Sequence, residues 1–399
     1  MANLINAKTS GVGGLETTAD NTGNINIQSG GSTVMEVTSA GVAVTGSLTQ
    51  NGGAYSTQPT FRNRIINGNM TINQRGSASY DITGAVYTLD RYRGSASISS
   101  KFSIAPGTTT PPAGFTNYLQ VTSSAATTPG STDNYSFFQR VEGYNVADLN
   151  WGTSDAQTVT MSFWVRSTLT GTFGGKLQNS AQNRIYIFSY TISSANTWEK
   201  KTITITGDTT GTWLTTTGVG LAINFSVGAG TGAEATAGSW GTDNVPYQPT
   251  GSTNVVATSG ATWQITGLQL EVGTTATDFE NLQYGTQLSL CQRYFWSSTN
   301  NIWVFGNAAN FGGALSVSLN NIKYPVRMRA SPSISHGTAG NNQASRRGST
   351  IGTFTISTLL ESGADSLNLT IYNGGGGLTW SYTDSYTVEI TNFIANAEL

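Results

Sequence analysis

Short runs in which apolar and polar residues alternate recur along most of this 399-residue chain. Residues 158–165, 184–192, 201–206 and 219–225 are clear examples, and turn-rich stretches such as 105–112 separate them. A period of two residues is that of a β-strand with one buried face. No helical pattern of about 10–15 residues lies between these runs, so the sequence predicts an antiparallel sandwich or jelly roll rather than a parallel sheet.

The composition favours a folded β protein over a disordered one. Glycine supplies 48 residues, and the residues that make good helices are scarce. Thr, Val, Ile and aromatic residues suit a pleated, half-buried surface. The chain also contains 9 Trp, 16 Tyr and 15 Phe, whereas disordered chains contain few aromatic residues. We therefore expect an all-β fold.

The pattern divides the chain into three parts. Residues 1–58 form an arm rich in Gly, Ser, Thr and Asn, whose predicted strands are too short to bury a core within one chain. Identical chains wrapped around a common axis would supply that core, and a frayed tail is the alternative. Residues 59–296 are predicted as a central jelly roll or β-sandwich. Residues 297–399 are predicted as a smaller β-sandwich, with alternating runs at 314–319 and 367–372.

One segment departs from the strand pattern. Within residues 281–295, the side chains of Tyr284, Leu288, Cys291 and Phe295 recur at helical spacing. This spacing predicts a short helix between the central part and the last part, with these four residues on one face.

The charge content excludes some classes of partner. Only 10% of the residues are charged, and the net charge is -2. Such a chain has no basic surface for binding DNA or RNA through counterion release, and no polybasic stretch for an anionic membrane. It also has no run of about 18 apolar residues for membrane insertion. We therefore expect neither nucleic acid nor membrane as a partner.

The residues of common catalytic and metal sites are nearly absent. With one histidine, His336, and one cysteine, Cys291, a Cys/His zinc site cannot form within one chain. The glycine-rich runs 11–14 and 374–377 lack the Lys-Ser/Thr that follows a phosphate-binding loop. We therefore expect no enzyme, no metal and no cofactor. Glycosidase action needs two carboxylates across a cleft, and no spacing selects such a pair. The candidate acids are Asp133, Glu142, Asp148, Glu271, Asp278 and Glu280.

Two stretches are more specific than the strand pattern. The first comprises residues 61–76 and the Leu-Asp-Arg-Tyr run at 89–92. The second begins at residues 265–273 and continues through 277–280 to 290–295. The first stretch resembles the opening, and the second the close, of a domain common in tail-fibre proteins of phages and prophages. Further resemblance to the distal unit of such proteins lies in residues 324–332 and 397–399, and to their virion-proximal arms in the N-terminal arm.

This resemblance implies an elongated, trimeric virion fibre whose jelly roll is similar to carbohydrate-binding modules. The implied function is host attachment by a tail fibre or receptor-binding protein, through multivalent, non-catalytic binding to bacterial envelope glycans. The arm would contact other virion proteins. A structural fibre or decoration protein on the capsid or neck, a polysaccharide depolymerase and a free-standing carbohydrate-binding module are the alternatives.

The arginines of the opening stretch are expected to have a structural role. Charged groups in a polar sandwich are scarce and are usually paired, so these arginines are predicted to tie the first and last strands together. A sugar-binding arginine is the alternative. The arginines are Arg62, Arg64, Arg75 and Arg91, and the predicted partners are Asp90, Glu271, Asp278 and Glu280.

Aromatic side chains are the best candidates for ligand contacts. Trp and Tyr rings stack on the apolar faces of sugars, and their polar edges form hydrogen bonds. Tryptophans in or near predicted strands are expected in the core, whereas aromatic residues near loops and hairpin ends are expected to contact a ligand or an interface. The predicted core tryptophans are Trp164, Trp198, Trp213 and Trp263. The predicted ligand-binding residues are Trp240, Tyr247, Trp303, Trp380 and Tyr382.

Overall fold

The computed structural model divides the chain into two compact units, Met1–Thr60 and Phe61–Leu399. The predicted division into three parts stays a prediction. The structure describes residues 3–7, 15–16, 25–29, 32–38, 41–44, 49–50, 53–54, 61–76, 79–298, 302–311, 314–335, 343–346, 349–353, 358–372, 385–390 and 392–399. Their side chains are described for residues 25–28, 32–38, 61–76, 79–298, 302, 322–335, 363–367, 390 and 392–399.

The first unit contains a five-stranded sheet in the order β2-β1-β3-β4-β5. The pairing of β1 with β3 is parallel and the other pairings are antiparallel. A two-stranded sheet of β6 and β7 follows it. The strands are β1 (Asn3–Ala7), β2 (Leu15–Glu16), β3 (Ile25–Ser29), β4 (Ser32–Thr38), β5 (Gly41–Val44), β6 (Thr49–Gln50) and β7 (Gly53–Ala54).

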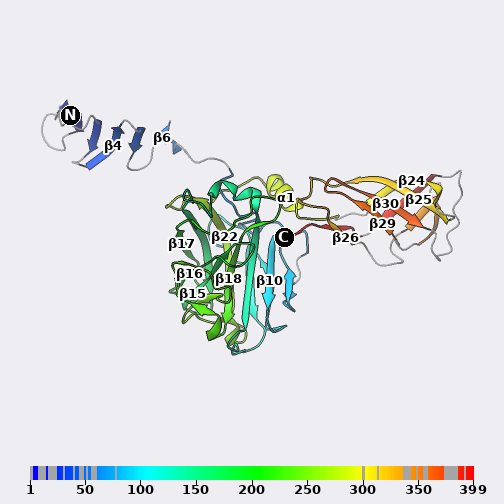
Figure 1. Cartoon of the computed structure of the whole chain (residues 1–399), viewed down its shortest axis with the longest axis horizontal. Helices are drawn as coiled ribbons and strands as arrows, with labels where there is room; N and C mark the ends of the chain where they lie inside the picture. The colour runs from blue at the N-terminus through cyan, green and yellow to red at the C-terminus, as the bar shows by residue number, and fades with distance from the viewer. Residues whose placement is uncertain are drawn as a thin grey trace. The chain divides into compact units, whose positions relative to one another are not determined.

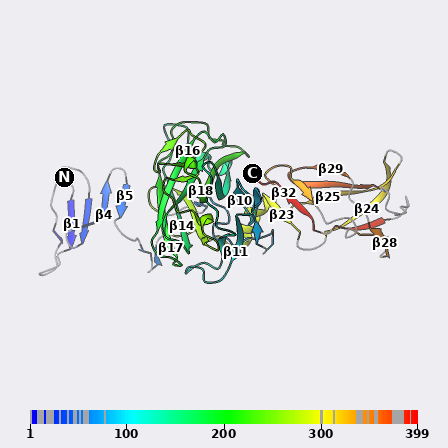
Figure 2. The same cartoon turned by 90° about the horizontal axis from the view of Figure 1, so that it is seen from below.

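The second unit begins with two antiparallel sheets packed face to face, which confirms the predicted all-β jelly-roll or sandwich fold (Figure 1, Figure 2). The seven-stranded sheet runs in the order β20 (Trp240–Gly241), β16 (Ile185–Ile192), β15 (Gly171–Gln178), β18 (Val219–Ala229), β13 (Asn134–Glu142), β10 (Tyr92–Ala96) and β9 (Ala85–Tyr87). The six-stranded sheet runs in the order β17 (Glu199–Ile205), β14 (Val159–Ser167), β22 (Thr262–Val272), β12 (Tyr118–Ser123), β11 (Phe102–Gly107) and β8 (Tyr80–Asp81). Two short strands, β19 (Glu234–Ala235) and β21 (Gln248–Pro249), form a parallel pair. They fall between β18 and β22 in the sequence.

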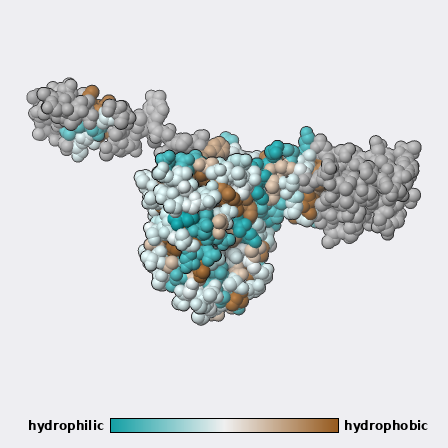
Figure 3. All heavy atoms as spheres, in the orientation of Figure 1, coloured by the Kyte–Doolittle hydropathy of each residue, from teal (hydrophilic) through white to brown (hydrophobic). Residues whose placement is uncertain are grey.

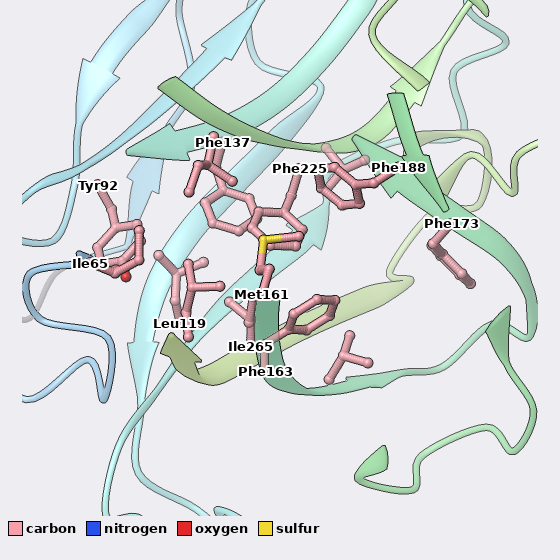
Figure 4. Close-up of a cluster of buried hydrophobic side chains, with 14 of the residues drawn as sticks. Ile65, Tyr92, Leu119, Phe137, Met161, Phe163, Phe173, Phe188, Phe225 and Ile265 are labelled. Atoms are coloured by element: carbon pink, nitrogen blue, oxygen red, sulfur yellow. The ribbon is translucent and has the colours of Figure 1, made fainter. Parts of the chain in front are cut away.

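Aromatic side chains from both sheets fill the core between them (Figure 4). Phe225 of β18 stacks on Phe137 of β13 at a centroid distance of 5.2 Å, and it meets Phe163 of β14 edge-on at the same distance. Trp263 of β22 is fully buried, as predicted, and donates its indole N–H to the Tyr190 hydroxyl oxygen over 3.1 Å. The other three predicted core tryptophans are only partly buried. The alternating runs therefore point their apolar residues inward, as a period of two requires.

The opening stretch joins the closing stretch through the backbone and through buried polar groups. Asn67 adopts a φ of 60° and lies under 2% exposed, and its side-chain amide donates to the carbonyl oxygen of Ile72 over 2.9 Å. In this turn the positive φ thus occurs at Asn67 and not at the neighbouring Gly68. Gly68 is needed for another reason: a Cβ there would lie 2.1 Å from the carbonyl oxygen of Leu268 on β22.

The arginines of the opening stretch are paired, but mostly with other acids than those predicted. Arg62 reaches Glu271 over 3.5 Å, which confirms that prediction. Arg64 pairs with Asp148, and both Arg75 and Arg91 pair with Glu398, which the sequence did not single out. These ion pairs connect the opening stretch to segments that are distant in the sequence, as expected. Of the predicted acids, Asp90 accepts from Gln74, and Glu280 accepts from the backbone N–H groups of Phe61 and Asn63.

The predicted short helix is present as α1 (Tyr284–Gln292). Cys291 is fully buried and Leu288 is partly buried, whereas Tyr284 is 64% exposed and does not share the buried face that its spacing predicted. The buried Glu142 of β13 holds the segment after the helix: it accepts hydrogen bonds from Arg293 over 2.6 and 2.9 Å and from the Tyr294 hydroxyl over 2.6 Å.

The last hundred residues are also built from strands. β23 (Phe295–Ser297), β32 (Ile394–Asn396) and β26 (Ser333–Ser335) form a three-stranded sheet in that order. A seven-stranded antiparallel sheet follows, in the order β28 (Ser349–Thr353), β27 (Gln343–Arg346), β31 (Ser385–Ile390), β24 (Ile302–Phe311), β25 (Ala314–Lys323), β30 (Ser366–Tyr372) and β29 (Thr358–Ser362). Among the described residues, α1 is far too short to cross a membrane, and no other helix could do so.

The final residues of the chain pack back onto the seven-stranded sheet of the sandwich. The carbonyl oxygen of Leu399 accepts hydrogen bonds from the Tyr87 hydroxyl over 2.6 Å and from Arg140 over 2.7 Å. The carboxylate of Glu398 forms ion pairs with Arg91 and Arg75. The Arg91 guanidinium also lies 3.5 Å from the ring centroid of Tyr294. These contacts hold the end of the chain beside β9 and β13.

Candidate functional site

The outer face of the seven-stranded sheet, turned away from the core, carries a polar hollow of about 190 Å³. Figure 1 labels the strands β16, β15, β18 and β10 of this sheet in that order, with β13 between the last two. The space-filling view in the same orientation shows hydrophilic residues on the surface of the sandwich (Figure 3). We call this hollow the polar groove. It is lined by Ala85, Arg93, Ser95, Ser136, Phe138, Arg140, Gln178, Gln182, Asn224 and Tyr247.

Strand register assembles the groove from residues that are far apart in the sequence. Successive pairings place one row of side chains across five neighbouring strands, β9, β10, β13, β18 and β15. Residues directly opposite each other in antiparallel strands point to the same face. The row consists of Tyr87, Arg93, Phe138, Asn224 and Lys176.

The floor of the groove contains polar atoms that have no partner. Ser136 and Asn224 are only 1% and 5% exposed, yet the Ser136 hydroxyl and the Asn224 amide nitrogen form no hydrogen bond with the described residues. The same holds for Nε of Arg93 and Oε1 of Gln178. A buried polar atom without a partner costs about 1–3 kcal/mol, so such atoms rarely occur together without a reason. Four such atoms in one hollow make the polar groove the candidate site for a polar ligand.

Three other hollows of the described residues are larger but hold fewer such atoms. One of about 210 Å³ beside Arg64 and Tyr144 has a single unpartnered buried atom, Nε of Arg64. A cavity of about 470 Å³ beside α1 has a single unpartnered buried atom among its described lining, Oδ1 of Asn73. A cavity of about 240 Å³ between Trp151 and Trp213 has none among its described lining. Volume alone therefore does not select the site, whereas unsatisfied hydrogen-bonding capacity does.

A buried lysine lies at one end of the row. Lys176 is 1% exposed, and its ammonium lies 3.5 Å from the ring centroid of Tyr247 and 3.5 Å from the carbonyl oxygen of Asn244. Burial lowers the pKa of Lys176 to about 8, and the nearby carboxylate of Asp243 opposes that shift. A positive charge in this position needs an aromatic face and a polar neighbour to be tolerated.

Tyr247 is the predicted ligand-binding residue that the structure places at the groove. Its backbone N–H donates to the carbonyl oxygen of Ala233 over 2.8 Å, and β21 begins at the next residue. The ring packs on Lys176 and lines the groove. Burial raises the pKa of its hydroxyl, so Tyr247 is a neutral hydrogen-bonding group throughout the physiological range.

Trp240, another predicted ligand residue, lies away from the groove in a cluster of three tryptophans. Its ring meets Trp151 and Trp213 edge-on at centroid distances of 5.3 and 5.4 Å. Its indole N–H donates to the carbonyl oxygen of Thr206 over 2.8 Å. Both the ring and the N–H are thus engaged within the protein, and a ligand contact by Trp240 stays a prediction.

The side chains of the other predicted ligand-binding residues lie outside the described part of the structure, so their predicted role stays a prediction. Only the backbone of Trp303 is described, as part of β24, and Trp380, Tyr382 and His336 fall in undescribed segments.

None of the six candidate acids lines the groove. Glu142 is engaged with Arg293, Asp148 with Arg64, and Glu271 with Thr277 and Arg62. These three carboxylates therefore have structural partners within the protein.

Sequence reasoning missed most of the groove because its residues looked like the solvent-facing half of ordinary strands. Ser136, Phe138 and Arg140 alternate with the core residues of β13, as any outward-facing residues would. The available signal was that a lysine and an asparagine, Lys176 and Asn224, sit in otherwise apolar or glycine-rich strands.

No family profile and no curated protein matches this sequence. Many solved structures are similar to about half of the chain, and three of them are described here. The enzymatically active domain of tailspike protein 4 of bacteriophage CBA120 has a TM-score of 0.29 and 12% identity, with 53% of this chain and 22% of that chain covered. This chain thus spans about a fifth of the tailspike domain.

The other two are carbohydrate-binding modules. TmCBM61, solved in complex with β-1,4-galactotriose, has a TM-score of 0.28 and 12% identity over 53% of this chain and 99% of that chain. The family 11 module of the cellulosomal cellulase Lic26A-Cel5E of Clostridium thermocellum has a TM-score of 0.25 and 10% identity over 50% of this chain and 97% of that chain. At these TM-scores the likenesses carry no functional argument, so the function is inferred from the groove.

Proposed function

We propose that this protein is a non-catalytic attachment fibre of a phage virion, and that the polar groove binds a saccharide of the bacterial envelope. The observation that carries the saccharide site is the set of four unpartnered polar atoms in one hollow.

The chemistry of these atoms suits sugar hydroxyls. The amide nitrogen of Asn224 and Nε of Arg93 are donors, Oε1 of Gln178 is an acceptor, and the Ser136 hydroxyl is both. A sugar hydroxyl also donates one hydrogen bond and accepts others, so neighbouring hydroxyls on one ring can satisfy this mixture. The rings of Phe138 and Tyr247 supply the apolar surface on which a sugar face packs.

The hollow of about 190 Å³ is smaller than the roughly 300–1,000 Å³ of sites for drug-sized ligands. A site of that size suits one saccharide unit and a modest affinity. Weak sites repeated in a homotrimer, the assembly that the fibre resemblance implies, would reach useful avidity without a strong single contact. In this proposal the N-terminal arm contacts other virion proteins, and the protein belongs to the virion surface.

The test is binding of the full chain to purified envelope polysaccharides of candidate hosts, measured by biolayer interferometry. Replacing Asn224 by Ala removes a donor from the groove floor, and we expect about a tenfold loss of affinity. The matched control is Asn281→Ala, at an exposed position before α1, which should bind as the wild type does.

Two outcomes would contradict the proposal. Equal binding by the Asn224→Ala and wild-type proteins would remove the groove as the site. Release of reducing ends from the polysaccharide would favour the depolymerase alternative over a non-catalytic fibre.

A further inference from the structure

One hydrogen bond links a short exposed segment to the seven-stranded sheet beneath it. Residues 242–246 connect β20 to β21, and Val245 among them is 42% exposed. The described residues form two hydrogen bonds with this segment. The first is internal, from the backbone N–H of Val245 to Oδ1 of Asp243 over 3.0 Å. The second runs from the ammonium of Lys176 on β15 to the carbonyl oxygen of Asn244 over 3.5 Å, so this lysine alone joins the segment to the sheet by a hydrogen bond.

The contacts of the Lys176 ammonium all lie in this segment or directly after it. The side chain of Lys176 is 1% exposed, and the neighbouring strands place Ile187 and Asn224 opposite it. Neither of these two side chains carries a charge or titrates. Among the described residues, the ammonium contacts the carbonyl oxygen of Asn244 and the ring of Tyr247, whose centroid lies 3.5 Å away.

Tyr247 connects this lysine to the polar groove. Tyr247 lines the groove and Lys176 does not, so the lysine acts on a ligand only through the ring. The backbone of Tyr247 is held by its hydrogen bond to the carbonyl oxygen of Ala233. Its ring forms no aromatic pair with another ring of the described residues, whereas the ammonium lies against it. The placement of this wall of the groove therefore depends on the ammonium.

The strength of this contact depends on the charge of Lys176. A protonated amine is attracted to an aromatic face, and the attraction is larger where water is excluded, whereas a neutral amine lacks it. Burial lowers the pKa of Lys176 to about 8, against the influence of the Asp243 carboxylate. Burial raises the pKa of the Tyr247 hydroxyl above its ordinary value of 10.0. Between pH 7 and pH 9 the lysine therefore loses its charge while the ring stays neutral.

From this arrangement we infer that Lys176 is a positioning residue of the polar groove: its ammonium holds residues 242–247 against the sheet, so that the ring of Tyr247 is in place to pack on the ligand, and loss of the proton weakens ligand binding. This inference rests on the proposed saccharide-binding function and adds the control of that site by pH. A segment with few ties opens at a small cost in free energy, so the loss of one tie changes how often the wall of the groove is formed.

The experiment measures binding of the full-length protein to the purified envelope polysaccharides by biolayer interferometry at pH 7, 8 and 9 and constant ionic strength. For the wild type we expect the affinity to fall by about threefold to tenfold between pH 7 and pH 9, with a midpoint near the pKa of about 8.

Two variants isolate the charge of Lys176. Lys176→Met removes the charge, so at pH 7 it should bind about threefold to tenfold more weakly than the wild type, and its affinity should not change between pH 7 and pH 9. Lys176→Arg carries a charge that does not titrate in this range, so its profile should also be flat. The control Lys200→Met replaces an exposed lysine of β17 in the other sheet and should follow the wild-type profile.

Stability does not explain the expected loss of binding. Removal of a buried charge favours the folded state at pH 7, so Lys176→Met should bind more weakly without being less stable. Circular dichroism melts verify that each variant is folded. Hydrogen exchange at pH 7 adds a readout that needs no ligand: the amides of residues 242–247 should exchange about threefold faster, or more, in Lys176→Met than in the wild type.

The outcomes distinguish this inference from the proposed function. If Lys176→Met binds as the wild type does at every pH, while Asn224→Ala binds more weakly, the positioning role is overturned and the saccharide site stands. If the wild type binds no polysaccharide at any pH, the proposed function is overturned. In that case, unchanged hydrogen exchange of residues 242–247 in Lys176→Met overturns the hold of the lysine on this segment as well.

Discussion

The buried Lys176 makes the stability of the sandwich depend on pH in a predictable direction. Its pKa in the folded protein is lowered from 10.5 to about 8, mainly by burial. Above pH 10.5 the lysine is neutral in both the folded and the unfolded state, so burial of a charge has no effect on stability. As the pH falls from 10.5 through about 8, the unfolded state binds a proton before the folded state does, and stability is lost.

The size of this effect follows from the two pKa values. Each pH unit between them corresponds to about 1.4 kcal/mol, so the difference between 10.5 and about 8 amounts to about 3 kcal/mol at neutral pH. Replacing Lys176 by Met keeps much of the side-chain volume and removes the charge. The stability of the Met variant relative to the wild type should therefore be about 3 kcal/mol more favourable at pH 7 than at pH 10.5.

Urea unfolding followed by tryptophan fluorescence at a series of pH values measures this difference. The control Lys200→Met replaces an exposed lysine of the other sheet and measures the general effect of removing one positive charge. If the difference between Lys176→Met and the wild type is the same at pH 7 and pH 10.5, then Lys176 does not titrate in this range and the reasoning from burial is wrong.

Two further substitutions test how the sandwich is held together. Glu142→Gln weakens the hydrogen bonds to Arg293 and Tyr294. We expect the free energy of unfolding in urea to fall by about 2–3 kcal/mol and hydrogen exchange in residues 284–297 to become faster. An unchanged urea midpoint would contradict the anchoring of this segment. Gly68→Ala places a Cβ 2.1 Å from a backbone carbonyl of β22, and we expect a loss of about 1–3 kcal/mol. By contrast, Gly285→Ala lies in an exposed and open position of α1 and should stabilise the protein by up to about 1 kcal/mol. If both glycine substitutions have similar effects, the close approach of Gly68 to the carbonyl oxygen of Leu268 is refuted.

Local patterns were enough to predict the class of fold and some of its details. The period of two in β14 and β18 predicted strands with one buried face, and the short helix was predicted from residue spacing near Cys291. The structural use of the opening arginines was also predictable, since a chain with few charges tends to pair them. Their partners were not, because Glu398 lies more than three hundred residues along the chain from Arg75.

The candidate site was predictable only in part. Tyr247 was selected for its residue type and its place near a loop, and the structure places it at the groove. Trp240 has the same two properties but lies within a cluster of tryptophans. Residue type indicates which side chains are able to bind a sugar, but it does not indicate whether neighbours in the fold already occupy them.

The sequence by itself determined that this protein is built from strands, because side-chain alternation and β propensity act between near neighbours in the chain. Only the tertiary structure decided which outward-facing residues share a surface. Arg93, Phe138, Asn224 and Lys176 form one row because β10, β13, β18 and β15 are adjacent in the sheet and paired in a particular register. That order depends on the packing of the whole core, so no local pattern in the sequence encodes the groove.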